Sequence, residues 1–163
     1  MKKVLIAFAL VASAYVSQAA YLYWQVSDAA NGAAGGASYD TAYFVANYGG
    51  TDYRLEGISP ASTGSSSVFD TSSWSTPSIA WNDASTKYYV ELVNSSTSTT
   101  VVRNDEGFSY SQLAVSSMSS LSADIAAAQA TLNSASYSAV PEPTSGLMLL
   151  TGLALLGLRR KRV

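Results

Sequence analysis

Residues 87–93 read KYYVELV, and this stretch gives the clearest strand signal in the chain. Aromatic and β-branched side chains, which favour strands, make up most of it. A polar turn at 94–99 separates it from a second short strand expected at 100–104. The two segments together predict a β-hairpin.

A second hairpin is predicted nearer the N-terminus. TAYFVAN at 41–47 has the composition of a strand, and Gly49-Gly50 after Tyr48 forms a turn signal. Residues 52–58 follow as its expected partner.

Two further strands are expected at 20–27 and 108–115. The first reads AYLYWQVS and places Leu22, Trp24 and Val26 on one face, which is therefore expected to point inward.

The segments 31–37 and 59–78 are expected to be loops. The first is rich in Gly and Ala, and the second is a low-complexity run of Ser, Thr, Gly and Pro. A free loop of that length is unusual in a small domain, so we expect its aromatic residues to pin it to the rest of the fold.

One helix is expected at 119–134. Its apolar residues recur at helical spacing, and small polar residues precede them as a cap. The apolar positions are Leu121, Ile125, Ala128 and Leu132.

These elements predict a mainly β fold: a small β-sandwich or an open antiparallel sheet with one C-terminal amphipathic helix. We expect this exported domain at 20–134, after a signal peptide at 1–19. A linker at 135–139 then leads to a C-terminal tail at 140–163.

The N-terminus has the features of a secretory signal peptide. Lys2 and Lys3 precede an apolar run at 4–16, and small residues follow at the positions that a signal peptidase reads. Cleavage is predicted after Ala19, with Ala20 as the alternative.

The C-terminal tail reads VPEPTSGLMLLTGLALLGLRRKRV. The apolar run at 146–158 would form a helix about 20 Å long, which is short for a hydrocarbon core of roughly 30 Å. It predicts a transient membrane stop. The basic end keeps the terminus on the cytoplasmic side; it consists of Arg159, Arg160, Lys161 and Arg162.

This run is preceded by Pro141, Glu142 and Pro143. The two prolines are expected to hold this segment in an extended, accessible conformation. This Pro-Glu-Pro box, the short apolar helix after it and the basic end resemble, in that order, the PEP-CTERM sorting domain of Gram-negative bacteria. The resemblance implies recognition by an exosortase, removal of the helix, and delivery to the cell surface or an extracellular polysaccharide matrix. It covers the tail alone.

Charge and composition narrow the functional classes. Residues 20–140 hold three basic and ten acidic residues, a net charge of −7, which argues against nucleic acid as a partner. The chain has no cysteine and no histidine, so thiol nucleophiles, disulfides and the commonest general base are missing. No cofactor and no metal site are predicted.

The remaining polar residues offer two kinds of candidate site, a Ca²⁺ site and a pair of carboxylates. Asn104-Asp105-Glu106-Gly107, or Asp28 with Asn31, offers oxygen ligands for Ca²⁺, but neither has EF-hand spacing and a plain turn explains each better. Asp52 and Glu56 have a four-residue spacing that is ordinary for a solvated hairpin face.

Trp74 is the residue expected to be most available to a sugar ring, because it lies in the polar loop. We therefore expect a non-enzymatic structural or adhesive surface protein. The alternatives are a carbohydrate-binding module acting on exopolysaccharide and, less favoured, a carboxylate-dependent glycan hydrolase. The expected partners are signal peptidase and an exosortase-type enzyme, with exopolysaccharide as a third candidate.

Overall fold

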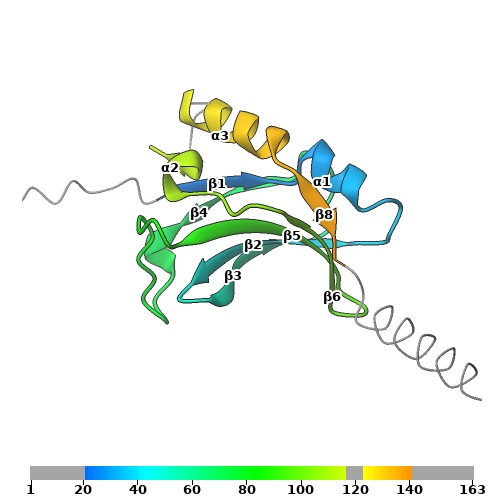
Figure 1. The fold of residues 1–163 in the computed structure, drawn as a ribbon, viewed down its shortest axis with the longest axis horizontal. Helices are drawn as coiled ribbons and strands as arrows, with labels where there is room; N and C mark the ends of the chain where they lie inside the picture. Colours follow the sequence, from blue (N-terminus) through cyan, green and yellow to red (C-terminus); the bar gives the residue numbers. More distant parts are fainter. Residues whose placement is uncertain (1–20, 117–122, 141–163) are drawn as a thin grey trace, which may run out of the picture.

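Two hairpins build the larger of two sheets in the computed structural model, which describes residues 21–116 and 123–140 (Figure 1). β2 (Thr41–Tyr48) and β3 (Thr51–Ile58) are joined by Gly49 and Gly50, whose φ angles of 62° and 80° suit a tight hairpin turn. β5 (Lys87–Asn94) and β6 (Thr99–Asn104) form the second hairpin. Both hairpins predicted from the sequence are confirmed.

The larger sheet has five antiparallel strands in the order β3-β2-β5-β6-β8. β2 and β5 pair from Thr41↔Val93 to Asn47↔Lys87 and join the two hairpins. The last strand, β8 (Tyr137–Ala139), pairs with the outer edge of β6.

The smaller sheet has three strands in the order β4-β1-β7. Its central strand is β1 (Tyr21–Gln25), flanked by β4 (Ser66–Asp70) and β7 (Ala114–Val115). The molecule is therefore mainly β, with two antiparallel sheets packed face to face.

Two helices, α2 (Tyr110–Leu113) and α3 (Ala123–Ser134), cover the smaller sheet on the side away from the larger one (Figure 1). Both pack on β1, and α1 (Asp28–Ala33) lies beside β8. A single 3₁₀ turn follows β4 at Thr71–Ser73. The layers are helices, small sheet and large sheet.

β1 is buried on both faces because it lies in the middle layer. Leu22 and Trp24 point toward the larger sheet, where the Trp24 and Phe44 rings stack with centroids 5.7 Å apart. On the other face, Gln25 donates to Asn133 of α3 at 2.9 Å. The expectation that Leu22, Trp24 and Val26 point inward is confirmed, since all three are fully buried.

The core between the sheets is an aromatic stack. The ring of Phe44 lies between those of Trp24 and Tyr88, with the Tyr88 centroid 5.6 Å away. Phe69 of β4 meets the same ring at a tilt. This stack joins β1, β2, β4 and β5.

Two predicted loops contain regular structure. Within 31–37 and just before it, residues 28–33 form α1, because the Ser27 side chain accepts a hydrogen bond from Ala30 N and caps the helix. Within 59–78, β4 pairs with β1 and buries Phe69. The prediction of loops was wrong at these places, although the aromatic residue does pin the segment.

The predicted strand at 108–115 is mostly not a strand. Phe108 makes one isolated bridge with Tyr88, after which the chain turns into α2 and only the two residues of β7 pair with β1. Ser109 and Gln112 form a capping box that starts the helix.

The predicted linker at 135–139 was also wrong. Residues 137–139 form β8, and the Val140 N–H continues the ladder by donating to Val101 O at 2.8 Å. The short Tyr-Ser-Ala strand carries no apolar alternation, so pairing with β6 decides its structure. The predicted helix is confirmed over 123–134, with Ile125, Ala128 and Leu132 buried.

No helix among the described residues is long and apolar enough to cross a membrane. The predicted signal peptide, membrane segment and Pro-Glu-Pro box lie outside the described residues.

Candidate binding face

The larger sheet turns one face away from the smaller sheet, and we call this its outer face. No helix or strand within 21–116 and 123–140 covers it (Figure 1). Its side chains alternate with the core residues of the same strands. They are Tyr43, Val45, Asn47, Asp52, Arg54, Lys87, Tyr89, Glu91, Val93, Thr100 and Arg103.

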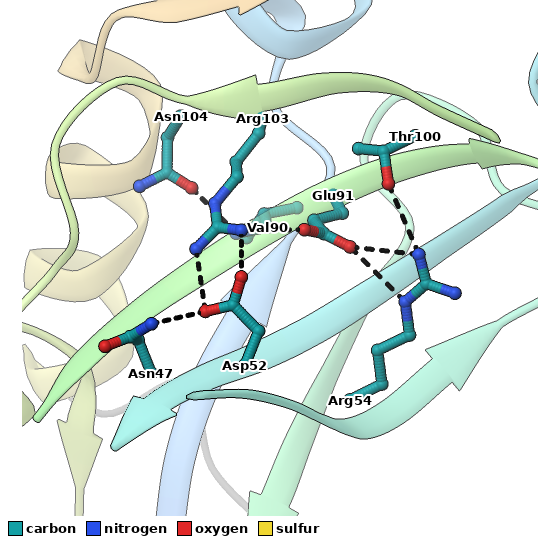
Figure 2. A network of polar contacts seen from close by, with 8 residues as sticks. All are labelled: Asn47, Asp52, Arg54, Val90, Glu91, Thr100, Arg103 and Asn104. Carbon is teal, nitrogen blue, oxygen red and sulfur yellow. Dashed lines mark hydrogen bonds and ion pairs between the residues drawn. The ribbon is translucent and has the colours of Figure 1, made fainter. Parts of the chain in front are cut away.

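Glu91 is the centre of a charged network on this face (Figure 2). One carboxylate oxygen lies 3.3 Å from Arg54 and the other 3.0 Å from Arg103. The Glu91 side chain is only 8% exposed, while those of Arg54 and Arg103 are 42% and 24% exposed. A buried carboxylate thus holds two guanidinium groups that solvent reaches.

Asp52 completes the network from the edge strand β3. Arg103 contacts both oxygens of Asp52, with Nη2 donating at 3.2 Å, and Asn47 donates to the same carboxylate at 2.6 Å. The hydrogen bond from Arg103 is the main reason that the pKa of Asp52 lies below its usual value.

The pKa of Arg103 is raised. Burial opposes the charged form, but the hydrogen bond and charge of Asp52, together with the charge of Glu91, outweigh it. Both members of the Arg103–Asp52 pair are therefore charged at neutral pH.

Each arginine lies on a tyrosine ring. The guanidinium carbon of Arg54 is 4.6 Å from the ring centre of Tyr43, and that of Arg103 is 3.7 Å from the ring centre of Tyr89. Each contact lies within the distance of a cation–π interaction, which adds to the attraction that the carboxylates exert on the arginines.

Two glycines make room for these tyrosines. A Cβ on Gly57 would lie 2.8 Å from the Tyr43 ring, and one on Gly107 would lie 2.8 Å from Tyr89 and 2.5 Å from the Lys87 Cβ. Neither distance is compatible with a real side chain. The absence of a side chain at these positions therefore leaves the space that the two rings occupy.

All basic residues within 20–140 lie on the outer face. Residues 20–140 contain only Arg54, Lys87 and Arg103 as cations. Lys87 alternates with Tyr89 and Glu91 on β5, and the structure records no ion pair for it among the described residues. An acidic domain thus gathers its positive charge on one side.

A β-bulge separates Asp52 from Glu56. Between Phe44↔Glu56 and Val45↔Arg54 the register shifts, so Leu55 is an extra residue in β3. Asp52 then faces outward to Arg103, while Glu56 accepts from the core Trp24 indole at 2.9 Å. The four-residue spacing was predicted to be a solvated face; instead, the two carboxylates lie on opposite faces.

A pocket of about 400 Å³ lies between the turn after β6 and the helices α2 and α3. Its walls are mostly carboxylates, an amide and hydroxyls, with Phe108 and Ala135 as the apolar part. The polar groups come from Asp105, Glu106, Gln112, Thr131, Ser134 and Ser136. Its size falls within the usual range for small-ligand sites.

Trp74, the predicted sugar contact, packs inside the loop. Its side chain is half-buried against the core, and its indole N–H donates to Pro77 O at 3.1 Å. A sugar contact at Trp74 stays a prediction, but the structure gives this residue a packing role.

The side chain of Asn104 stabilises the turn at 104–107. The Asn104 side chain is buried, accepts from Val90 N at 2.8 Å and donates to Glu106 O. Asn31 likewise accepts from the Tyr39 hydroxyl. Among the described residues no group of three or more acidic side chains is arranged to hold a metal ion.

The remaining predicted site residues lie outside the described part of the chain. They are Ala19 and Ala20, Pro141, Glu142 and Pro143, and Arg159, Arg160, Lys161 and Arg162.

Sequence reasoning missed the outer-face network. The signal that could have found it is a pair of doublets, Tyr43-Phe44 and Tyr88-Tyr89, each of which must place one aromatic ring on each face of a strand.

Comparison with protein families finds the PEP-CTERM protein-sorting motif at residues 139–162. The resemblance identified from the sequence is therefore confirmed for this segment. No curated protein and no solved structure matches the chain. The motif indicates an exported protein that is sorted to the cell surface and processed by an exosortase-type enzyme.

Proposed function

We propose that the folded domain is a non-catalytic structural or adhesive element that acts at the cell surface or in the extracellular matrix. The observation that carries the proposal is the outer face: a solvent-accessible array of arginine, tyrosine and carboxylate groups (Figure 2) that no helix or strand among the described residues covers (Figure 1). Arginine and tyrosine are the residues that most often dominate binding surfaces.

The acidic residues support a non-catalytic role because many of them have local structural partners. Asp70 caps the 3₁₀ turn, and Asp83 accepts from Ser85 in another turn. Glu56 accepts from both Trp24 and Ser67. These carboxylates stabilise the fold through hydrogen bonds, and those hydrogen bonds engage their oxygen atoms.

The route to the surface is part of the proposal. Signal peptidase would cleave after Ala19 or Ala20, and the precursor would be held briefly in the membrane of a Gram-negative cell. Mass spectrometry of the mature protein from its native host tests this route. Loss of the residues after Pro143 is expected, whereas an intact RRKRV end would contradict it.

The adhesive role is tested with the full-length chain in its native host. Replacing both Arg54 and Arg103 by Gln is expected to leave the protein on the surface but to reduce its retention in the matrix after washing. Asp28→Asn, a change at an exposed position of α1, is the matched control. Equal retention of all three proteins would argue against an adhesive outer face.

Carbohydrate binding is the second candidate. The pocket of about 400 Å³ favours it, because carboxylate, amide and hydroxyl groups are suited to sugar hydroxyls. A glycan hydrolase is the weakest of the three. Asp52 and Glu56 lie on opposite faces, and Asp105 and Glu106 are exposed neighbours in one turn. Polysaccharide cleavage that is abolished by Glu106→Gln would revive it.

A further inference from the structure

We propose that the outer face binds an acidic polysaccharide through the carboxylate groups of the polymer, with Arg103 and Lys87 as the contacting cations. Asp52 then acts as an internal carboxylate that occupies Arg103 until the polymer replaces it. This inference rests on the adhesive role proposed above and names its partner.

The distribution of charge over the domain favours an anionic partner at the outer face. The domain is acidic, yet its three cations all lie on this face. Glu91 and Asp52 neutralise the two arginines, and Lys87 is left with no recorded ion pair in the described residues. The outer face is therefore the one side of the domain that offers an unsatisfied positive charge to an anionic chain.

The two carboxylates that hold Arg103 differ in how easily they can be replaced. The Glu91 side chain is 8% exposed and is fixed by both arginines, whereas that of Asp52 is 40% exposed and lies on the edge strand. Asp52 contacts both terminal nitrogens of Arg103. A sugar carboxylate can take over this geometry because a planar guanidinium pairs with any carboxylate in the same way.

Tyr89 lies close to both cations of the proposed site. The guanidinium carbon of Arg103 is 3.7 Å from the centre of the Tyr89 ring, and Lys87 precedes Tyr89 by two residues on the same face of β5. The ring holds the guanidinium in place before a ligand arrives, so little ordering is needed on binding. Two cations on one face of the sheet then match a polymer that repeats its carboxylates.

The face lacks the apolar centre that a protein partner usually covers. Val45 and Val93 lie on it but are buried beneath the longer side chains. In the described part of the chain, Val140 is the one large hydrophobic residue that is exposed, and it lies at the end of β8. Because stable protein interfaces have an apolar core, a polar polymer fits this surface better than a second copy of the chain.

The test uses the full-length chain in detergent, titrated calorimetrically with an oligogalacturonate and with the neutral galactose oligomer of the same length. Binding of the acidic oligomer alone is expected. Arg103→Gln should weaken it at least about tenfold, which is the loss of roughly 1.4 kcal/mol. Lys87→Gln should weaken it by about threefold.

Asp52→Asn gives the sharpest result, because removing the internal competitor should strengthen binding by about three- to tenfold. Asp28→Asn removes the same charge from α1 and controls for the reduced long-range repulsion of the acidic domain. Circular dichroism confirms that each variant is folded. If Arg103→Gln unfolds the protein, the Asp52→Asn and Lys87→Gln results decide alone.

Four results would overturn the inference. Equal binding of both oligomers would show glycan recognition without charge. No binding, or no difference between Asp52→Asn and Asp28→Asn, would leave the matrix retention experiment as the separate test of adhesion. Concentration-dependent self-association that Arg103→Gln abolishes would identify a second copy as the partner.

Discussion

The two faces of the larger sheet are built from neighbouring residues and have opposite chemistry. Phe44 and Tyr88 enter the aromatic core, whereas the adjacent Tyr43 and Tyr89 support arginines on the outer face. Two aromatic doublets therefore contribute to a core and to a candidate binding surface at once. The difference shows that strand alternation, and not residue type, decides what a tyrosine does here.

The largest contrast is expected between Phe44→Ala and Tyr43→Ala. Phe44 is fully buried between two stacked rings, so its removal should lower the free energy of unfolding by about 3–5 kcal/mol. Tyr43→Ala should cost about 1 kcal/mol, mainly through the lost contact with Arg54. Urea denaturation of the full-length chain measures both, and equal losses would contradict a difference between the faces.

Removing the centre of the outer network should come next. Glu91→Ala leaves Arg54 and Arg103 without their shared carboxylate and should cost about 2 kcal/mol, less than a fully buried pair because solvent reaches both arginines. Glu106→Ala, at an exposed turn position, is the control and should change the stability by less than about 0.5 kcal/mol. A loss in Glu91→Ala no larger than this would mean that the network adds nothing to stability.

Gly107→Ala tests whether the outer face needs the missing side chain. The new methyl group would overlap Tyr89 and Lys87, so a loss of about 1–2 kcal/mol is expected. Gly32→Ala is the matched change, since a Cβ there meets no atom within 4 Å and alanine favours the helix α1. Thermal melts should therefore shift in opposite directions, and a parallel shift would disprove the steric argument.

The smallest expected difference is between Tyr88 and Tyr89, in their effect on the stability of the fold at high pH. Burial raises the pKa of Tyr88 above its usual value of 10.0, so the folded state keeps a proton that the unfolded state loses. Stability is then complete below pH 10 and falls above it, by at most about 1.4 kcal/mol per pH unit for this group.

Tyr88→Phe should make the alkaline loss shallower, although it also removes the hydrogen bond to Trp81 O. Tyr89→Phe should keep the loss seen in the unchanged protein. Denaturation curves at pH 8, 10 and 11 check both variants, and identical pH profiles for them would rule out Tyr88 as the source.

The hairpins could be predicted because each strand carries its own signal. KYYVELV and TAYFVAN are rich in aromatic and β-branched residues, and Gly49-Gly50 marks the turn between β2 and β3. The helix was readable from Ile125, Ala128 and Leu132 for the same reason. A local sequence pattern is enough to predict an element whose buried apolar residues recur at regular spacing.

The missed elements depend on partners that are distant in the sequence. β8 exists because β6 offers a free edge, and β4 lies within a serine-rich segment, 59–78, whose one buried residue is Phe69. α1 depends on the Ser27 cap, since its Asn-Gly sequence favours a turn. Tertiary pairing overrides weak local preference in each case.

The candidate site could not be predicted because the register between β2 and β3 shifts by one residue. Leu55 is bulged, so Asp52 faces Arg103 while Glu56 turns to Trp24. No pattern in the sequence shows this shift, because a one-residue change moves every following side chain to the other face. The charge pattern could show only that cations are few.

β8 also decides how the domain would respond to a pulling force. A chain held by its C-terminal side loads residue 140 first, where the Val140 N–H is bonded to Val101 O. Behind that bond stand the three pairs between β8 and β6, from Ala139 to Tyr137, and the hydrogen bond from the Tyr137 hydroxyl to Leu132 O. We therefore expect this short edge strand to detach under load before the force reaches the aromatic stack.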